Sequence, residues 1–136
     1  MALNLLEKNI SRHSETVKVL DKLESGISVD AMDKIAAYLG VSVNELMVNL
    51  KISRSTWHRR KKSGRLDFNL SDKILQLSKL LEHAENVFGN RDKVQLWFKV
   101  PSIVFENHKP IEFIGSLSGM NLINDELVRI EHGVFI

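Results

Sequence analysis

Apolar residues recur along most of this chain at intervals of three and four, the spacing of amphipathic α-helices, whereas the alternation typical of strands is weak. Residues that cap helix N-termini precede these apolar segments, and glycines or a proline follow most of them. The sequence therefore predicts an all-α fold. The first six expected helices are bounded by Ser14 and Gly26, Ser28 and Gly40, Ser42 and Leu50, Ser53 and Gly64, Ser71 and Gly89, and Asn90 and Pro101.

The C-terminal part of the chain is less regular. Residues 102–109 fit either a short extended piece or a packed loop, and Pro110 suits the first turn of a short helix through Ser116. A last helix follows, and Gly133 closes it. The apolar residues on the expected helix faces are Val17, Leu20, Leu23, Met32, Ile35, Ala36, Leu39, Ile74, Leu77, Leu81, Ala84, Phe88, Val94, Trp97, Phe98, Met120, Ile123, Leu127 and Ile130.

Positive charge is concentrated in one short stretch. Lys51–Arg65 contains seven basic residues and no acidic one. Residues 1–50 hold five basic and seven acidic residues, and residues 66–136 hold seven basic and ten acidic, so both flanks are net negative although the chain is +2 overall. The basic stretch is a predicted helix that follows another helix and a tight turn, which is typical of a DNA recognition helix.

The segment Ser42–Lys62 fits a helix-turn-helix motif. The apolar residues that would hold its two helices together are Leu46, Met47, Leu50, Ile52 and Trp57. Side chains on the opposite face, near the N-terminus of the second helix, are those that reach base edges and phosphates in such motifs. The predicted DNA-binding residues are Ser53, Arg54, Ser55, Thr56, His58, Arg59, Lys61 and Lys62, with Arg65 as a further contact to the DNA backbone.

The turn of this motif departs from the usual pattern, because Lys51 stands where glycine is common. A left-handed backbone there costs roughly 1 kcal/mol more for lysine than for glycine. The turn could therefore differ from the standard form. The basic stretch also has a plainer interpretation, as a solvated helix face with Trp57 in the core.

Several classes of function are not supported. The chain has no cysteine, so a disulfide framework and a thiolate metal site are excluded. Its five histidines are scattered, and neither a phosphate-binding glycine loop nor a nucleophile elbow is present. We expect no enzyme activity, no cofactor and no metal. The N-terminus does not resemble a secretory signal and no apolar run approaches a membrane span, so we expect a soluble cytoplasmic protein.

The basic run ends near Leu66–Leu70, which predicts two domains, residues 1–68 and 69–136.

The chain resembles the Xre/MbcA/ParS antitoxins over nearly its whole length. In the basic helix the resemblance lies in the spacing of Thr56, Arg59 and Arg60. In the second half it lies in Ala84, Phe88-Gly89, Trp97, Pro101, Pro110, Gly119, Leu127 and the ending Arg129-Ile130-Glu131-His132-Gly133-Val134-Phe135.

The resemblance implies an antitoxin of a type II toxin–antitoxin system, with a helix-turn-helix half and a helical toxin-binding half. Its partners would be a RES-domain toxin, an NAD-consuming enzyme, and operator DNA, bound as a homodimer to repress the shared operon. The C-terminal segment would cover the active site of the toxin. The expected toxin-binding residues are Arg129, Glu131, His132, Gly133, Val134, Phe135 and Ile136, and the surface around Trp97–Ser116 is the alternative.

Two other functions remain open from the sequence. One is a stand-alone helix-turn-helix repressor whose C-terminal half dimerises it or senses a ligand. The other is a structural interaction protein in which the basic helix is only a solvated face. A neighbouring gene for a RES-domain protein would favour the antitoxin, and failure to bind upstream DNA would favour the structural protein.

Overall fold

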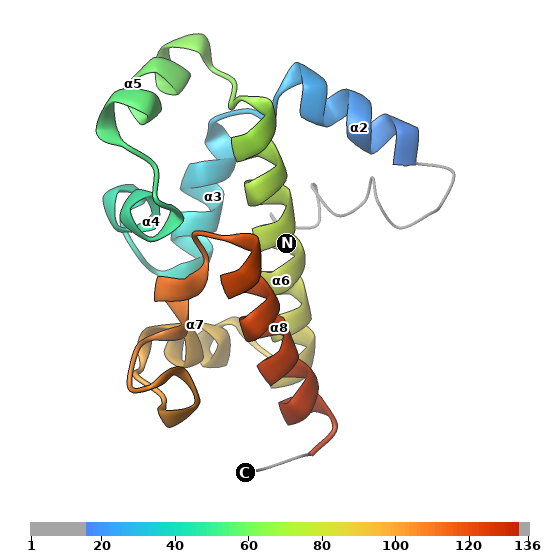
Figure 1. Cartoon of the computed structure of the whole chain (residues 1–136), viewed down its shortest axis with the longest axis vertical. Helices are drawn as coiled ribbons and strands as arrows, with labels where there is room; N and C mark the ends of the chain where they lie inside the picture. Colours follow the sequence, from blue (N-terminus) through green and yellow to red (C-terminus); the bar gives the residue numbers. More distant parts are fainter. Residues whose placement is uncertain (1–15, 134–136) are drawn as a thin grey trace.

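The computed structural model of the chain describes residues 16–133 (Figure 1). Within this range the regular structure is helical, with α-helices α2 to α8 and two short 3-10 helices, η2 and η3, and no strand beyond isolated bridges. The predicted all-α fold is confirmed. The elements are α2 (Thr16–Ser25), α3 (Asp30–Leu39), α4 (Val43–Leu50), α5 (Arg54–Ser63), α6 (Phe68–Phe88), α7 (Arg91–Lys99), η2 (Ile103–Phe105), η3 (Pro110–Phe113) and α8 (Leu117–Glu131).

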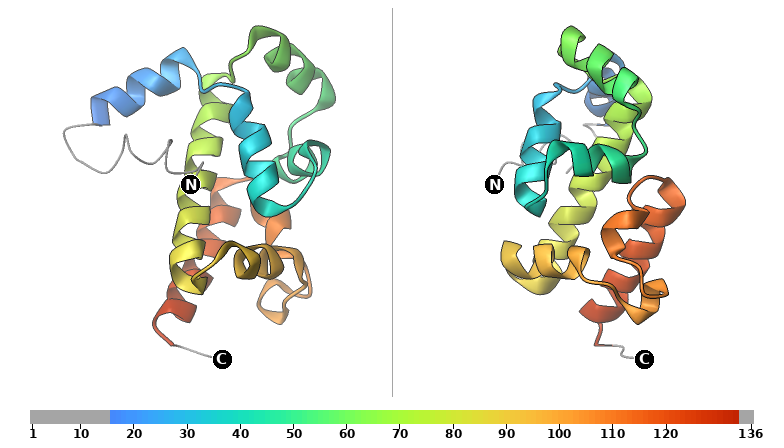
Figure 2. Two further views of the ribbon diagram at one scale, coloured as in Figure 1. Left: turned by 180° about the vertical axis from the view of Figure 1, so that it is seen from behind. Right: turned by 90° about the vertical axis from the view of Figure 1, so that its left-hand side faces the viewer.

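Helix α6 is the central element of the molecule. It is 21 residues long and contacts α2, α3, α7 and α8. Figures 1 and 2 show α2 to α5 gathered around its first half, and α7 and α8 around its second half. The division expected between residues 68 and 69 falls at the first residue of this helix, and it stays a prediction.

One apolar core runs through both halves, from Leu23 of α2 to Leu127 of α8. The two halves also meet directly where α7 packs on the end of α3. Arg91 of α7 donates to the carbonyls of Ala37 (2.8 Å) and Tyr38 (3.2 Å), and Gln95 donates to the carbonyl of Tyr38 (2.7 Å). Carbonyls in the last turn of a helix lack the usual partner within the helix. The side chains of α7 therefore supply hydrogen-bond donors to the C-terminal end of α3.

Tyr38 at this junction is buried, and its surroundings act on the phenol. Burial, reinforced by the nearby Glu85 carboxylate, raises the pKa of Tyr38 to about 12. The guanidinium of Arg91 lies 5.9 Å from the centre of the Tyr38 ring. The tyrosine is therefore neutral at ordinary pH and packs as part of the interface between α3 and α7.

Several predicted helix caps are confirmed. Ser42, Ser53 and Asn90 each accept a hydrogen bond from the backbone three residues ahead, at 3.1, 3.1 and 2.9 Å. The expected cap Ser14 lies outside the described residues. Ser28 is not the cap of α3, because Val29 occupies that position and Ser28 only accepts a bond of 3.3 Å from Asp30.

The predicted start of the longest helix was wrong. Helix α6 begins at Phe68, and the Asp67 carboxylate caps it by accepting from the Leu70 N–H at 2.8 Å. Ser71 is completely buried one turn inside the helix. Its hydroxyl accepts from the Ile27 N–H (2.9 Å) and donates to a backbone carbonyl, that of Leu66 (3.3 Å). A residue expected to start a helix therefore holds the connection between α2 and α3.

Two of the apolar residues expected to be buried in the first helix are not. Val17 is 67% exposed and Leu20 is 49% exposed, whereas Leu23 is buried. Figure 1 shows the reason, because α2 stands out from the side of the molecule and meets it only near its C-terminal end. The apolar spacing predicted the helix correctly. It did not show which part of the apolar face is buried within the described structure.

The less regular segment forms a packed loop with two short helical turns. An isolated bridge joins Ser102 and His108 around η2, in which Phe105 is buried. The helix expected from Pro110 through Ser116 is shorter, because η3 ends at Phe113. Ser116 instead caps α8, where its hydroxyl accepts from the Gly119 N–H at 3.0 Å. The glutamate of η3, Glu112, accepts from the backbone N–H of Lys109, which lowers the pKa of its carboxyl.

Candidate functional site

Helices α4 and α5 form the predicted helix-turn-helix. Leu46, Met47 and Leu50 are buried under α4. Lys51 adopts the left-handed backbone, with φ 62° and ψ 39°, and its N–H donates to the carbonyl of Val48 at 3.2 Å. The turn therefore keeps the left-handed residue of the standard form although lysine occupies the position.

Helix α5 presents its side chains to the surroundings, since none of its residues is buried. It is held at its start by Ile52 and Trp57, which are half-buried against the core. Figure 1 shows α5 at the edge of the molecule, at the end where α6 begins. Of the predicted DNA-binding residues Thr56 is half-buried, and those exposed are Ser53, Arg54, Ser55, His58, Arg59, Lys61 and Lys62.

Hydroxyl groups are gathered at the N-terminus of α5. Besides capping Thr56, the Ser53 hydroxyl lies 2.9 Å from the Thr56 hydroxyl and 3.2 Å from the Ser55 hydroxyl. A helix N-terminus carries partial positive charge, and anions such as phosphate bind there. This end of α5 can accordingly meet a phosphate group while Arg54 and Arg59 remain accessible.

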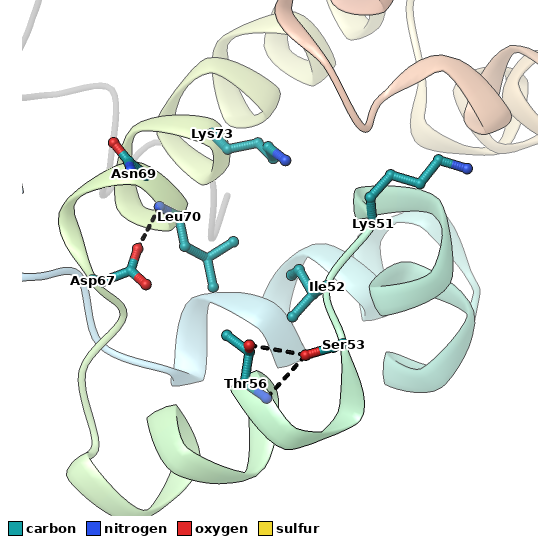
Figure 3. Close-up of a pocket in the computed structure, with 8 residues that line it drawn as sticks. All are labelled: Lys51, Ile52, Ser53, Thr56, Asp67, Asn69, Leu70 and Lys73. Atoms are coloured by element: carbon teal, nitrogen blue, oxygen red, sulfur yellow. Dashed lines mark hydrogen bonds between the residues drawn. The ribbon is translucent and has the colours of Figure 1, made fainter.

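A hollow of about 300 Å³ lies between the turn and the start of α6 (Figure 3). Lys73 of α6 donates across it to the carbonyl of Leu50, at 3.1 Å. The end of α4 is thus completed by a side chain of the central helix. The lining residues are Lys51, Ile52, Ser53, Thr56, Asp67, Asn69, Leu70 and Lys73.

One arginine of the basic stretch has a structural contact that the sequence did not indicate. Arg65 was expected to contact the DNA backbone, but its guanidinium donates to the carbonyl of Gly26 at 3.1 Å. The neighbouring Leu66 N–H donates to the carbonyl of Ile27 at 2.8 Å. Arg65 therefore helps to fix the connection between α2 and α3.

The predicted toxin-binding segment begins in the last turn of α8. Arg129 is exposed and lies 3.4 Å from Glu126 on the same helix. The Glu131 carboxylate lies 3.3 Å from Nε2 of His83 on α6, whose Nδ1 lies 2.8 Å from the Asn124 side chain. Glu131 is accordingly part of the contact between α6 and α8.

The rest of this segment leaves the helix. His132 and Gly133 are exposed, and Gly133 has a φ of 69°. Val134, Phe135 and Ile136 lie outside the described residues. The structure places Arg129, Glu131, His132 and Gly133 at one end of α8, and their role in binding stays a prediction.

An apolar surface on α7 and η2 was only broadly indicated by the sequence. We name it the α7 surface and define it by Leu96, Val100, Ile103 and Val104, which are all exposed, Ile103 by 87%. It borders a hollow of about 560 Å³ lined by Phe88, Lys93, Leu96, Trp97, Val100, Pro101 and Ser102. The dense apolar run from residue 96 to 105 was the available signal, and only Trp97 and Phe98 within it were expected on a helix face.

Packed aromatic rings support the α7 surface from below. The Trp97 ring lies 5.6 Å from Phe88, 5.1 Å from Phe98 and 5.8 Å from Phe105, measured between ring centres. Phe105 in turn lies 5.3 Å from Phe113. Aromatic pairs at such separations add to the stability of a core. The exposed apolar side chains are therefore displayed on a packed base, as expected of a protein-binding surface.

Residues 16–133 contain no group of three or more histidine, cysteine, aspartate or glutamate residues arranged to hold a metal ion. In the same range, no helix has both the length and the apolar character needed to cross a bilayer.

Known families match two consecutive parts of the chain. The family described as "Antitoxin Xre-like helix-turn-helix domain" matches residues 18–79, which include α4 and α5. The family described as "Antitoxin Xre/MbcA/ParS C-terminal toxin-binding domain" matches residues 83–133, which include the α7 surface and α8. The candidate DNA-binding helix and the candidate partner surfaces thus fall in different matched segments.

Two curated proteins are similar to most of the chain. The "Antitoxin Xre" of Yersinia enterocolitica serotype O:8 / biotype 1B is 28% identical over 119 residues, which cover 86% of this chain and 80% of that protein. The "Antitoxin Xre" of Photorhabdus laumondii subsp. laumondii is 28% identical over 118 residues, which cover 82% of this chain and 77% of that protein.

Proposed function

We propose that this chain, which belongs to the Xre-type antitoxins, neutralises a cognate toxin and represses the operon that encodes both proteins. The family is not one of enzymes, and it joins a helix-turn-helix domain to a toxin-binding domain. The observation that carries the proposal is the separation of two surfaces. A basic helix with no buried residue lies beside one half of α6, and an apolar surface within the toxin-binding segment lies beside the other.

DNA binding is assigned to the exposed face of α5. Arg54 and Arg59 can each donate two hydrogen bonds to guanine, and Lys61 and Lys62 neutralise phosphates. One short helix reads few bases, so we propose that the chain binds its operator as a homodimer with two half-sites. Repression would follow if the operator overlaps the promoter of the operon.

The cognate toxin is proposed to be a RES-domain protein that degrades NAD. We assign its inhibition to residues 129–136, which would cover the entrance of the toxin's active site. Gly133 supports this assignment, because its left-handed backbone, with φ 69°, is typical of a residue that ends a helix. The α7 surface would supply a second, apolar area of contact.

The operator contacts are tested by substituting the two arginines. Arg54→Ala and Arg59→Ala should each weaken operator binding by about 1–3 kcal/mol if the side chains read bases. Arg129→Ala is the matched control, because it removes the same charge from an exposed position on α8. Fluorescence anisotropy on the upstream DNA and on a random duplex provides the measurement.

The outcomes of that titration separate the possible roles. Equal losses on operator and random DNA would mean that the arginines contact only phosphate. Unchanged operator affinity in both variants would disprove the assignment of α5 as the recognition helix. Co-purification with the product of the adjacent gene tests the partner, and its failure would favour the stand-alone repressor.

A further inference from the structure

The turn of the helix-turn-helix depends on contacts from outside the motif. Lys51 holds a left-handed backbone that glycine adopts more easily, and α5 beyond it has no buried residue. The direction of α5 therefore depends on the geometry of residues 49–53 as well as on the half-buried Trp57. Whatever fixes those residues also contributes to the direction of α5.

A glycine of the C-terminal half touches this turn. A β-carbon on Gly115, in the loop between η3 and α8, would lie 2.7 Å from the carbonyl oxygen of Asn49 and 2.7 Å from Cγ of Lys51. Gly115 does not have a positive φ, so its backbone does not itself require glycine. Because Gly115 has no side chain, the loop that contains it can contact the end of α4 and the aliphatic part of the Lys51 side chain.

Lys73 supports the same turn from a second direction. Its ammonium group donates to the carbonyl of Leu50, which is the last residue of α4. Figure 3 shows Lys73 on α6 and Lys51 on the turn before α5, with the Lys73 side chain extending from α6 toward the turn. The turn is thus held between α6 on one side and the η3–α8 loop on the other.

We propose that Gly115 and Lys73 are positioning residues for DNA binding, which set the direction of α5 by fixing the turn before it. The toxin-binding half then completes the DNA-binding unit without touching DNA. This inference rests on the proposed function, because it assumes that α5 binds the operator.

The first test is Gly115→Ala in the full chain, with the upstream DNA as the probe. The added methyl group does not fit unless the loop and the turn move apart, so the turn should lose its support and operator affinity should fall on the order of tenfold. Hydrogen exchange of the Lys51 and Ile52 amides, which bond to Val48 and Met47, should quicken in the absence of DNA.

Gly89→Ala is the matched control for lost stability. Gly89 has a φ of 90° with no atom near its missing β-carbon, so alanine strains the end of α6 without touching the turn. Operator affinity should stay at the wild-type value at a comparable loss of melting temperature. Equal losses of affinity in both variants, or an unchanged affinity in Gly115→Ala, would overturn the proposal.

Lys73→Met is a second test of the proposed positioning role, for the case in which Gly115→Ala does not fold. It should lower operator affinity about threefold or more, whereas Lys79→Met, which removes the same charge from an exposed site on α6, should not. The salt dependence of binding should keep its wild-type slope in Lys73→Met. A slope reduced by about one would show a direct phosphate contact and overturn the positioning role of Lys73.

The exchange measurement separates failure of this inference from failure of the proposed function. If the wild-type protein binds no upstream DNA, the proposed function is wrong. Faster exchange in Gly115→Ala would still show that Gly115 stabilises the turn. Unchanged exchange together with normal operator binding in that variant would remove the inference alone.

Discussion

Single residues often serve roles that their type suggests only in part. Serine and aspartate both favour helix N-caps, and the start of α6 was predicted at Ser71 although Asp67 caps the helix. The structure distinguishes them through the neighbouring segment. Leu66 is tied to Ile27 by a backbone bond of 2.8 Å, which places Ser71 beneath that connection and leaves Asp67 to cap the helix. The hydrogen bond from Ile27 to Ser71, which joins residues 44 positions apart in the sequence, therefore explains why Ser71 lies inside the helix and does not cap it.

Ser71→Ala tests this role at the scale of one hydroxyl. The substitution leaves the buried N–H of Ile27 without its acceptor, so the free energy of unfolding should fall by about 1–3 kcal/mol. Urea denaturation followed by circular dichroism gives the value. Ser25→Ala removes an exposed hydroxyl bonded to the Lys22 carbonyl and should change stability by less than about 0.5 kcal/mol. Similar losses in both variants would contradict the buried role of Ser71.

At the scale of elements, helix identity was predictable and helix surroundings were not. Apolar spacing with flanking caps located α3 to α5 and α7 well, because those signals lie within a few residues of each helix. The exposed half of α2 was missed, and the α7 surface was indicated only broadly, for one reason. Spacing shows that a face is apolar, but not whether the fold or a partner covers it. The basic face of α5 was easier to predict, because charged side chains are rarely buried.

The junction of α3 and α7 belongs to the class of features that sequence spacing cannot show, since its partners are more than 50 residues apart. Arg91→Ala removes the bonds to the Ala37 and Tyr38 carbonyls, so unfolding should become about 1–2 kcal/mol easier. Lys93→Ala, on an exposed position of the same helix, should cost less than about 0.5 kcal/mol. Equal effects of the two substitutions in chemical denaturation would show that the Arg91 bonds contribute nothing.

At the scale of the whole molecule, one core joins the helix proposed to bind DNA to the surfaces proposed to bind the toxin. The contacts of Arg91 and Gly115 mean that neither half is built independently of the other. The two surfaces are nevertheless distinct, because α5 and the end of α8 share no residue and lie beside opposite halves of α6. Mutations on the surfaces themselves should therefore separate the two activities, whereas mutations at the junctions should affect operator binding from a distance.

Removal of residues 133–136 tests that separation. The deletion lies beyond α8, so folding and operator affinity should be kept while protection from the toxin is impaired. The expected size follows from Phe135, since a buried aromatic anchor often contributes 2 kcal/mol or more to an interface. Arg54→Ala should have the opposite effect, weak operator binding with full protection. Growth and cellular NAD during coexpression with the toxin are the measurements.

The same assay decides between the two proposed areas of toxin contact. Ile103→Ser changes the most exposed residue of the α7 surface, and Leu117→Ser is its control, because Leu117 is 66% exposed on α8 and outside that surface. If the truncated chain still protects fully while Ile103→Ser does not, residues 133–136 are not the inhibitory element and the α7 surface holds the toxin. If both changes impair protection and Leu117→Ser does not, the segment blocks the active site and the apolar surface anchors it. Protection that survives both changes would show that neither residues 133–136 nor Ile103 is required to hold the toxin.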